Sequence, residues 1–368
     1  MHIPHTRVAR RLVGATWAVL AIFAIAALPA AADSEGYDQT NLVSDLPGIA
    51  RFVDPNLVNP WGLVAGPTTP WWVSDNGTGR STLYQGDGTI VPLVVEIPPP
   101  GNSPAGTTAA PTGIVFNGGA GFTVSKGNIS GASRFIFATE DGTISGWSPT
   151  VDATHAILKV DRSASGAVYK GLAIGSTAAG TFIYASNFNA GTVDVFNQNF
   201  GPASLGGSFK DAKIPSGYAP FGIQNLAGLI YVTYALQNAA KHDDVAGPGH
   251  GFVNVFSTNG VLVRRLIRRG RLNSPWGLAL APAKGFGEFS GHLLVGNFGD
   301  GRINAYEKKG EFEGTLQQSG KPIVIQGLWA LAFGNGQAAG PANHLFFTAG
   351  IEDEKHGLFG SIKPVADD

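Results

Sequence analysis

Short apolar runs separated by glycine-rich polar turns recur along most of this 368-residue chain. In the stretch 273–316, an apolar run follows Asn-Ser-Pro, and a second run at 292–296 ends in Asn-Phe-Gly-Asp-Gly. A third, alternating run at 302–306 then reaches another glycine turn. Runs of this length and alternation predict short strands, and the turn residues predict antiparallel hairpins. The stretch therefore predicts one small antiparallel sheet.

The same unit occurs six times along the chain. Its opening combines a glycine with small and apolar residues, and the first five copies carry that glycine at Gly62, Gly113, Gly171, Gly222 and Gly277. The sixth opening lies at 326–334 and continues this spacing of roughly 50 residues. Repeats near 50 residues made only of strands are typical of propeller blades, whereas helical solenoid repeats have about 33 to 47 residues. The sequence predicts an all-β, six-bladed β-propeller.

A ring of six blades has to be closed, because an open sheet edge invites aggregation. The sixth copy ends after its third strand, near Ile362, so its fourth strand has to come from elsewhere in the chain. A short apolar run at 40–43 stands before the first copy. We expect this N-terminal strand to pair with the strand at 357–362, which makes residues 33–368 a single propeller domain.

Residues 1–32 have the layout of a secretory signal peptide. Three arginines precede an apolar stretch at 12–28, and Pro-Ala-Ala-Ala at 29–32 supplies small residues for cleavage. A retained membrane anchor is the alternative, but the apolar run is short and rich in alanine. The sequence therefore predicts export to the periplasm or the medium, with no stable membrane span after cleavage. The absence of cysteine fits an exported protein without disulfides.

Charge and motifs narrow the range of functions. The formal net charge is −1, and the chain shows no basic surface of the kind that binds nucleic acid. Five arginines between Arg264 and Arg271 surround the predicted strand 261–267, where a solvated blade edge accounts for them. The chain has no phosphate-binding loop, no G-x-S-x-G elbow and no cysteine nucleophile. We expect neither a nucleotide cofactor nor a nucleic-acid partner.

Acidic residues gather in the loops that join the second and third strands of each copy. In a propeller, these six loops surround one mouth of the central channel. Carboxylate and amide oxygens that converge from several loops are what a hard cation such as Ca²⁺ requires. The predicted metal ligands are Asp75, Glu140, Asn187, Asp243, Asn297, Asp300 and Glu352. The alternative is that these residues only close turns by bonding to nearby backbone groups.

Two histidines in these loops are candidates for a functional role. His242 stands beside Asp243, an arrangement that can give a general base oriented by a carboxylate, and Glu140 is a further catalytic candidate. His250 ends an insertion at 237–250 in the fourth copy, which we expect to act as a lid that contacts a ligand. Exposed loop histidines without a function are the alternative interpretation.

Aromatic residues mark four of the six blade openings. They are Trp61, Phe221, Trp276 and Trp329. A ring of aromatic side chains near the channel could stack on a sugar or another flat ligand. The alternative is that they are wedges packed between neighbouring blades.

Several motifs give the chain a family resemblance. It resembles an uncharacterised family of exported bacterial propeller proteins, some of which carry a PEP-CTERM sorting tail, in the motifs NPWGL, WWVSDNGTG, FIFATEDGTISGW, GNFGDGRI, GLWALAFGNG and HGLFG. The resemblance covers the chain after residue 32 and implies no particular activity. Because the sequence ends in GLFGSIKPVADD without an apolar segment, it does not imply sorting by that tail.

The chain is more distantly similar to NHL-repeat and gluconolactonase-like propellers. That resemblance implies a divalent ion in the channel that supports ester or lactone hydrolysis, with Glu140, Asn187 and Asp243 as counterparts of the ligands by position. Two interpretations follow from the sequence. One is an exported module that binds a small molecule, a glycan or a protein at its acidic channel mouth. The alternative is a metal-dependent hydrolase of lactones or esters.

Overall fold

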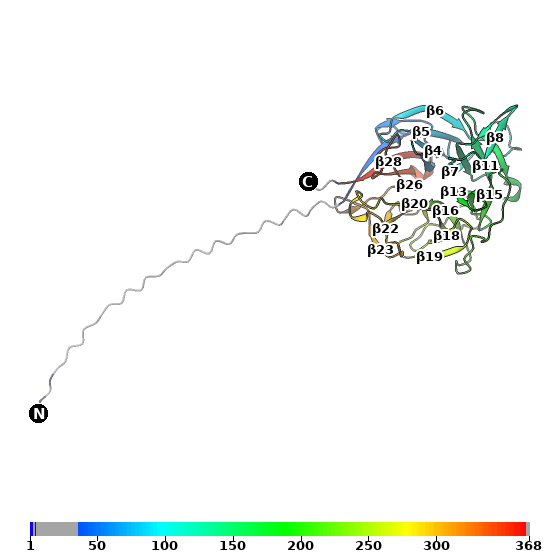
Figure 1. The fold of residues 1–368 in the computed structure, drawn as a ribbon. Helices are drawn as coiled ribbons and strands as arrows, with labels where there is room; N and C mark the ends of the chain where they lie inside the picture. The colour runs from blue at the N-terminus through cyan, green and yellow to red at the C-terminus, as the bar shows by residue number, and fades with distance from the viewer. Residues whose placement is uncertain (3, 5–35, 366–368) are drawn as a thin grey trace. The chain divides into compact units, whose positions relative to one another are not determined.

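The computed structural model describes residues 1, 2, 4 and 36–365, and it confirms the six-bladed all-β propeller. Five blades are separate antiparallel sheets, and the sixth is built from both ends of the propeller domain. Figure 1 shows the blades following one another around the ring in chain order. Strand β28 (His356–Pro364) pairs with β1 (Tyr37–Ser44), so the last blade includes the first strand.

The first three blades have these strands. Blade one contains β3 (Pro60–Val64), β4 (Trp71–Asp75), β5 (Arg80–Tyr84) and β6 (Ile90–Glu96). Blade two contains β7 (Pro111–Phe116), β10 (Phe135–Thr139), β11 (Thr143–Trp147) and β12 (Ile157–Asp161), with a hairpin of β8 (Thr123–Lys126) and β9 (Ile129–Ala132) between its first two strands. Blade three contains β13 (Tyr169–Thr177), β14 (Gly180–Asn187) and β15 (Thr192–Asn197).

The other three blades complete the ring. Blade four contains β16 (Tyr218–Leu226), β17 (Leu229–Leu236), β18 (Phe252–Ser257) and β19 (Leu262–Arg268). Blade five contains β20 (Pro275–Leu280), β21 (Leu293–Asn297), β22 (Ile303–Tyr306) and β23 (Phe312–Thr315). Blade six contains β26 (Leu328–Phe333), β27 (Leu345–Gly350), β28, β1 and the short β2 (Phe52–Val53). The small elements outside these sheets are β24 (Gln317–Gln318), β25 (Lys321–Pro322), η1 (Ser163–Ser165), η2 (Gly287–Phe289) and α1 (Ile351–Glu354).

Ring closure follows the arrangement expected from the sequence. Strand β1 pairs antiparallel with β28, with Thr40 opposite Ser361 and Val43 opposite Phe359. The register shifts by one residue between these pairs, where the strand carries a bulge. The order β2-β1-β28-β27-β26 places β1 in the position of the fourth strand, so the N-terminal segment covers the edge that β28 would otherwise expose.

The glycine shared by the blade openings allows the innermost strands to approach closely. A Cβ atom added to Gly62 would lie 2.3 Å from the Thr112 carbonyl oxygen, and one added to Gly222 would lie 2.1 Å from the Trp276 carbonyl oxygen. Both contacts join first strands of successive blades, and no real Cβ tolerates them. The repeated glycine therefore permits backbone-to-backbone packing around the channel.

We predict that ring closure depends on the apolar face of β1. Val43 is buried, whereas Thr40 on the same strand is exposed. The variant Val43→Asp buries an unpaired carboxylate and should lose about 3 kcal/mol or more of unfolding free energy. Thr40→Asp, the matched control, should stay within about 0.5 kcal/mol of wild type. Denaturant unfolding followed by circular dichroism measures both, and a chain that lacks residues 37–46 but melts unchanged would contradict the role of β1.

Candidate binding site at the channel mouth

The loops after the second strands lie at the starts of the first strands, as expected from the sequence. The backbone N–H groups of Asn76 and Glu140 donate to the carbonyl oxygens of Asn59 and Ala110, at 3.1 and 2.9 Å. Phe188 makes the equivalent bond in blade three. The residue that directly follows each of these second strands therefore stands at the same end of the channel, which we call the mouth.

A buried lysine is the centre of the mouth. Lys170, on β13, is 2 % exposed, and its ammonium group donates a hydrogen bond to Glu140 Oε1. It also lies 3.5 Å from Asp243 Oδ1 and 5.1 Å from the centre of the Trp61 ring. Carboxylates and an aromatic face are the groups that stabilise a cation removed from water. The lysine is thus held by groups from three other blades.

Amide side chains extend this network to blade six. Asn76 Nδ2 donates to the second oxygen of Glu140 at 2.8 Å. Asn59 Nδ2 donates to Glu354 Oε2 at 2.8 Å. Both oxygens of Glu140 are thereby engaged by protein donors. Burial raises the pKa of Glu354, and the negative charge of Glu140 adds to this effect.

The turn that carries Glu354 has an uncommon backbone conformation. Glu352, Asp353 and Glu354 have φ values of 53°, 56° and 64°, which form a left-handed turn within α1. Residues other than glycine adopt this conformation at a cost of about 1 kcal/mol or more each. His356, which follows the turn, has its Nδ1 2.6 Å from Asp45 Oδ2. The surrounding structure therefore holds a strained turn with an acidic side chain over the mouth.

The insertion in blade four, residues 237–250, is an ordered hairpin that we call the lid. A bridge joins Gln237 to Asp244, and the Gln237 side-chain amide donates to the Phe188 carbonyl oxygen at 2.6 Å. His250 closes the base of the lid, with its Nδ1 2.8 Å from the Val245 carbonyl oxygen. The lid is thus attached to blade three, the blade that carries Lys170.

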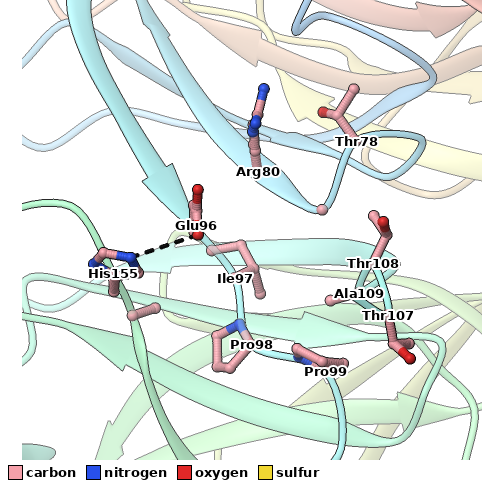
Figure 2. A pocket seen from close by; sticks show the side chains of 12 residues that line it. Thr78, Arg80, Glu96, Ile97, Pro98, Pro99, Thr107, Thr108, Ala109 and His155 are labelled. Atoms are coloured by element: carbon pink, nitrogen blue, oxygen red, sulfur yellow. Dashed lines mark ion pairs between the residues drawn. The ribbon is translucent and has the colours of Figure 1, made fainter. Parts of the chain in front are cut away.

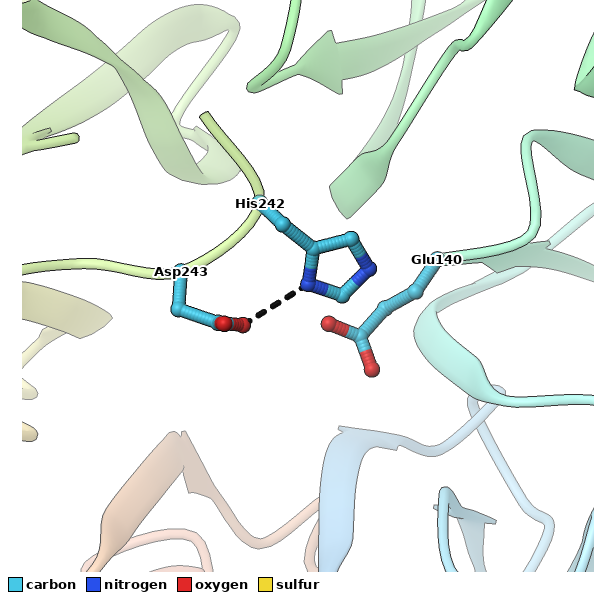
Figure 3. Close-up of side chains that lie close together, drawn as sticks. All are labelled: Glu140, His242 and Asp243. Carbon is cyan, nitrogen blue, oxygen red and sulfur yellow. Dashed lines mark hydrogen bonds and ion pairs between the residues drawn. The ribbon is translucent and has the colours of Figure 1, made fainter. Parts of the chain in front are cut away.

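The lid brings two predicted catalytic candidates to the third. His242 Nδ1 lies 2.8 Å from Asp243 Oδ1, and Figure 3 shows both side chains beside Glu140. One ligand atom from each of the three residues lies within 4.8 Å of the others. Burial alone would raise the pKa of Asp243, but His242 and Lys170 outweigh it and lower that pKa. The cluster of Glu140, Lys170, His242 and Asp243 is called the mouth cluster below.

The aromatic side chains of the blade openings fill the channel beneath this cluster. The rings of Trp61 and Trp329 stack with centroids 3.5 Å apart, and Trp276 meets both edge-on. Phe221 packs against Trp329 at 5.9 Å. Trp61 and Trp329 are 2 % and 1 % exposed, so their faces contact one another rather than solvent. Their predicted role as stacking partners for a ligand stays a prediction.

The remaining predicted metal ligands lie outside the mouth cluster. Asn187 donates to Asp194 Oδ2 at 3.1 Å, and Asn297 donates to the Arg271 carbonyl oxygen at 2.8 Å and to Asp300 Oδ1 at 3.1 Å. Asp75 is buried in blade one. Asp75, Asn187 and Asn297 each end a second strand, and successive side chains of a strand point to opposite faces. The side chain of the following residue reaches the mouth instead.

Glu352, the last of the predicted ligands, also lies outside the mouth cluster. The exposed Glu352 carboxylate lies 3.9 Å from His356 Nε2. Within residues 36–365, Glu140, His242 and Asp243 are the one group of three or more His, Asp or Glu side chains placed to share an ion. Two of the seven predicted ligands, Glu140 and Asp243, are thus brought together with His242.

Lys170, Asn59 and Glu354 were not among the site residues predicted from the sequence. A comparison of the repeats contains a signal for Lys170. The residue directly before the repeated glycine is aromatic in three blades, at Trp61, Phe221 and Trp276, whereas blade three has Lys170. Blade two has the buried Thr112 at this position. A basic residue where the other blades carry buried aromatic rings or a buried threonine indicates a buried charge that needs partners.

A separate hollow lies between blades one and two. Its volume is about 270 Å³, and Figure 2 shows the side chains that line it. His155 Nε2 lies 3.5 Å from Glu96 Oε2, and both side chains are more than half exposed. Exposed ion pairs of this kind contribute little to the free energy of unfolding. No residue of the mouth cluster lines this hollow.

Comparison with known proteins places the chain in a family of uncharacterised proteins. No protein-family model matches it. Uncharacterized protein L690 of Acanthamoeba polyphaga mimivirus is 35% identical over 330 residues, which cover 87% of this chain and 84% of the viral protein. Uncharacterized protein R648 of the same virus is 34% identical, over 87% of this chain and 78% of its own length. The chain belongs to the family of these two proteins.

Solved structures share the fold at low sequence identity. Aldose sugar dehydrogenase from Escherichia coli matches with a TM-score of 0.52 and 10% identity, over 89% of this chain and 100% of that one. A glucose dehydrogenase matches with a TM-score of 0.51 and 13% identity, over 89% and 99%. Virginiamycin B lyase from Staphylococcus aureus matches with a TM-score of 0.50 and 11% identity, over 90% and 100%. Identities this low show the fold alone.

We predict that Lys170 and Glu140 depend on each other. Lys170→Met leaves the Glu140 carboxylate without its cation, and removing one partner of a buried pair costs about 3–5 kcal/mol. The double variant Lys170→Met with Glu140→Gln should recover a large part of that loss. Lys126→Met, the control, breaks an exposed ion pair with Asp152 and should cost about 1 kcal/mol or less. Urea unfolding measures all four proteins, and a stable Lys170→Met single variant would contradict the coupling.

Proposed function

We propose that this protein is a ligand-binding module whose ligand is held at the channel mouth, between the lid and the Glu140–Lys170 pair. The convergence of charged side chains from several blades on one point supports this function. The buried ion pair and the left-handed turn at Glu354 both cost free energy of folding. Perturbed charges and strained backbone concentrate at functional sites, because the fold itself does not need them.

The charge of the mouth favours a ligand that carries positive charge. Four carboxylates, those of Glu140, Asp243, Asp244 and Glu354, surround the single ammonium group of Lys170. Burial raises the pKa of Asp244, and the charge of Asp243 raises it further. A cation would relieve this excess of negative charge. We therefore propose a divalent cation in the bound state, alone or together with a small molecule or a glycan.

The donor atoms of the mouth cluster fit a divalent ion of borderline softness. Two carboxylates and one imidazole lie close enough to bind one ion, and three protein ligands leave a position open for a further ligand. An imidazole favours Zn²⁺ or Mn²⁺ over the Ca²⁺ expected from the sequence, since Ca²⁺ prefers oxygen donors alone. The Lys170 ammonium group donates a hydrogen bond to Glu140 Oε1. A metal ion that binds Glu140 therefore has to displace the ammonium group from this carboxylate oxygen.

Metal binding at the mouth is tested on the purified protein by elemental analysis and by thermal unfolding with added Zn²⁺ or Mn²⁺. We expect one of these ions to raise the melting temperature of wild type by several degrees, because it binds only the folded state. Glu140→Gln and Asp243→Asn should abolish this rise. Asp87→Asn, an exposed residue of blade one, should keep it. A melting temperature that neither ion changes would remove the metal from the proposal.

A second candidate function is the hydrolysis of lactones or esters. It is favoured by His242, whose Nδ1 lies beside Asp243 and whose Nε2 remains available to take a proton from water. In this function His242 is not a ligand, and a divalent ion held by the carboxylates of Glu140 and Asp243 would supply polarisation of the substrate carbonyl. His242→Ala should then lower turnover of a hydrolysed lactone at least about 100-fold while leaving the melting temperature unchanged. If wild type hydrolyses no member of a lactone and ester panel, the binding function stands alone.

We also propose that the protein is exported after removal of residues 1–32. The composition of that segment supports export, although almost all of it lies outside the described residues. In the part of the chain that the structure describes, no helix is long and apolar enough to cross a membrane. Expression of the full chain in a Gram-negative host should yield a periplasmic protein whose N-terminus, determined by mass spectrometry, lies near Asp33. A cytoplasmic product with an intact N-terminus would contradict export.

A further inference from the structure

The contact between blade six and blade one contains two buried carboxylates. Asp75, at the end of β4, is 0 % exposed. In the β4–β5 pairing, Trp71 lies opposite Tyr84 and Val73 opposite Thr82, so Asp75 shares a face with Thr82 and Tyr84. This face meets blade six, because Tyr84 stacks on Phe359 of β28 with ring centroids 5.4 Å apart. We call this contact the seam.

The second carboxylate comes from the segment that closes the ring. Asp54 follows β2, and its side chain is buried. Its Oδ2 accepts a hydrogen bond from the Tyr84 hydroxyl at 3.0 Å, and its Oδ1 accepts one from the Asn56 backbone N–H at 2.9 Å. Its negative charge raises the pKa of Asp75, after burial, which is the largest cause. The seam thus brings together acids from the closing segment and from blade one.

The oxygen atoms of Asp75 lack hydrogen-bond donors. Among the described residues, neither Oδ1 nor Oδ2 has a hydrogen-bond partner, and the neighbouring Thr82 hydroxyl, which is also buried, has none. Thr82 is close enough to lower the pKa of Asp75 somewhat, but it does not reach hydrogen-bond geometry with it. The positive charge of Arg80 also lowers the pKa of Asp75, but the Arg80 Nη1 donates its hydrogen bond to Asn56 Oδ1. Three buried oxygen atoms are therefore unsatisfied in a place with too little positive charge.

Comparison with other blades shows what the seam lacks. The position of Asp75, at the end of the second strand, is occupied by Asn187 in blade three and by Asn297 in blade five. The amide nitrogen of Asn187 donates to Asp194, and that of Asn297 donates to the Arg271 carbonyl oxygen. An amide can donate, whereas an ionised carboxylate can only accept. Blade one therefore has two acceptor oxygens and a negative charge, those of Asp75, at the position where blades three and five have an amide donor.

We propose that the seam binds a Ca²⁺ ion, held by the carboxylates of Asp75 and Asp54 and by the hydroxyl oxygen of Thr82. The ligand atoms are all oxygen atoms, which suits a hard cation. The seam has no imidazole ligand of the kind that His242 provides in the mouth cluster. The ion supplies the positive charge that the Asp75 carboxylate needs. Blades three and five need no such charge, because their asparagine amides at this position are neutral. This site is independent of the ligand proposed for the mouth.

The proposed ion would join the segment that closes the ring to blade one. Asp54 belongs to the segment that continues from the closing strands β1 and β2, and Asp75 belongs to the body of blade one. An ion bound to both ties the closing segment to the next blade. Because such an ion binds the folded ring and not the unfolded chain, its removal lowers the stability of ring closure.

Terbium luminescence and calorimetry test the site on the whole propeller domain. Tb³⁺, which replaces Ca²⁺ at oxygen sites, should bind wild type and luminesce on excitation of tyrosine and tryptophan, because Tyr84 adjoins the site. Excess Ca²⁺ should displace it, and chelation should lower the melting temperature by several degrees. Asp75→Asn should lose the signal and the calcium-dependent shift. Glu140→Gln in the mouth cluster and Asp87→Asn on the surface should keep both.

Opposite results would overturn the site. Should wild type bind no ion while Asp75→Asn melts at or above the wild-type temperature, Asp75 is a neutral acid that holds a proton, since asparagine mimics that form. A signal lost in Glu140→Gln but kept in Asp75→Asn would place the ion at the mouth and remove it from the seam. If Asp75→Asn does not fold, Thr82→Val decides, because it keeps both carboxylates. It should weaken Tb³⁺ binding about 10-fold, and unchanged binding would contradict the proposed ligand set.

Discussion

The close approach of the innermost strands around the channel is the constraint on which the other features depend. At Gly62, Gly222 and Gly277, a carbonyl oxygen of the neighbouring blade lies where a Cβ atom would be, so these positions accept glycine alone. Little space remains on the axis, and the aromatic side chains before these glycines fill it. A channel filled in this way leaves its mouth as the place where polar side chains from several blades can meet.

The same packing explains why a lysine can be buried beside tryptophan. In blade three, the lysine stem replaces an aromatic ring in the inner packing, and its ammonium group lies over the face of Trp61. Removing an ammonium ion from water costs several kcal/mol, which a neighbouring carboxylate and a π-face offset only in part. The Trp276 indole N–H donates to the Lys170 carbonyl oxygen at 2.8 Å and fixes the backbone at this point. The neighbouring carboxylates therefore have to hold the Lys170 ammonium group in place. The ammonium group in turn competes with any other cation for these carboxylates.

The fold could be predicted from the sequence because its signals are local and are repeated. Alternating apolar runs, hairpin turns and a regularly spaced glycine give six sheets, and the missing strand of the last sheet points to residues 40–43. The site could be predicted only in part. The mouth and its lid follow from blade order and loop length, but the side chains that reach the mouth depend on strand phase. Asp75 and Asn297 differ by one residue from the positions that face the channel, and a one-residue difference reverses the side of a strand.

Comparing the blades of a repeat protein also distinguishes residues that the fold requires from residues that it does not require. Each blade has to solve the same packing problem, so a residue type that recurs at one position is explained by the fold. A departure from the shared residue has no such explanation and has to be compensated locally. Lys170 departs from the aromatic residues of blades one, four and five and is compensated by Glu140 and Asp243. Asp75 differs from the asparagines at the same position of blades three and five, and no donor among the described residues forms a hydrogen bond with its carboxylate. Since a buried charge without a partner is too costly to persist, the second departure requires a partner from outside the chain, either a proton or a metal ion.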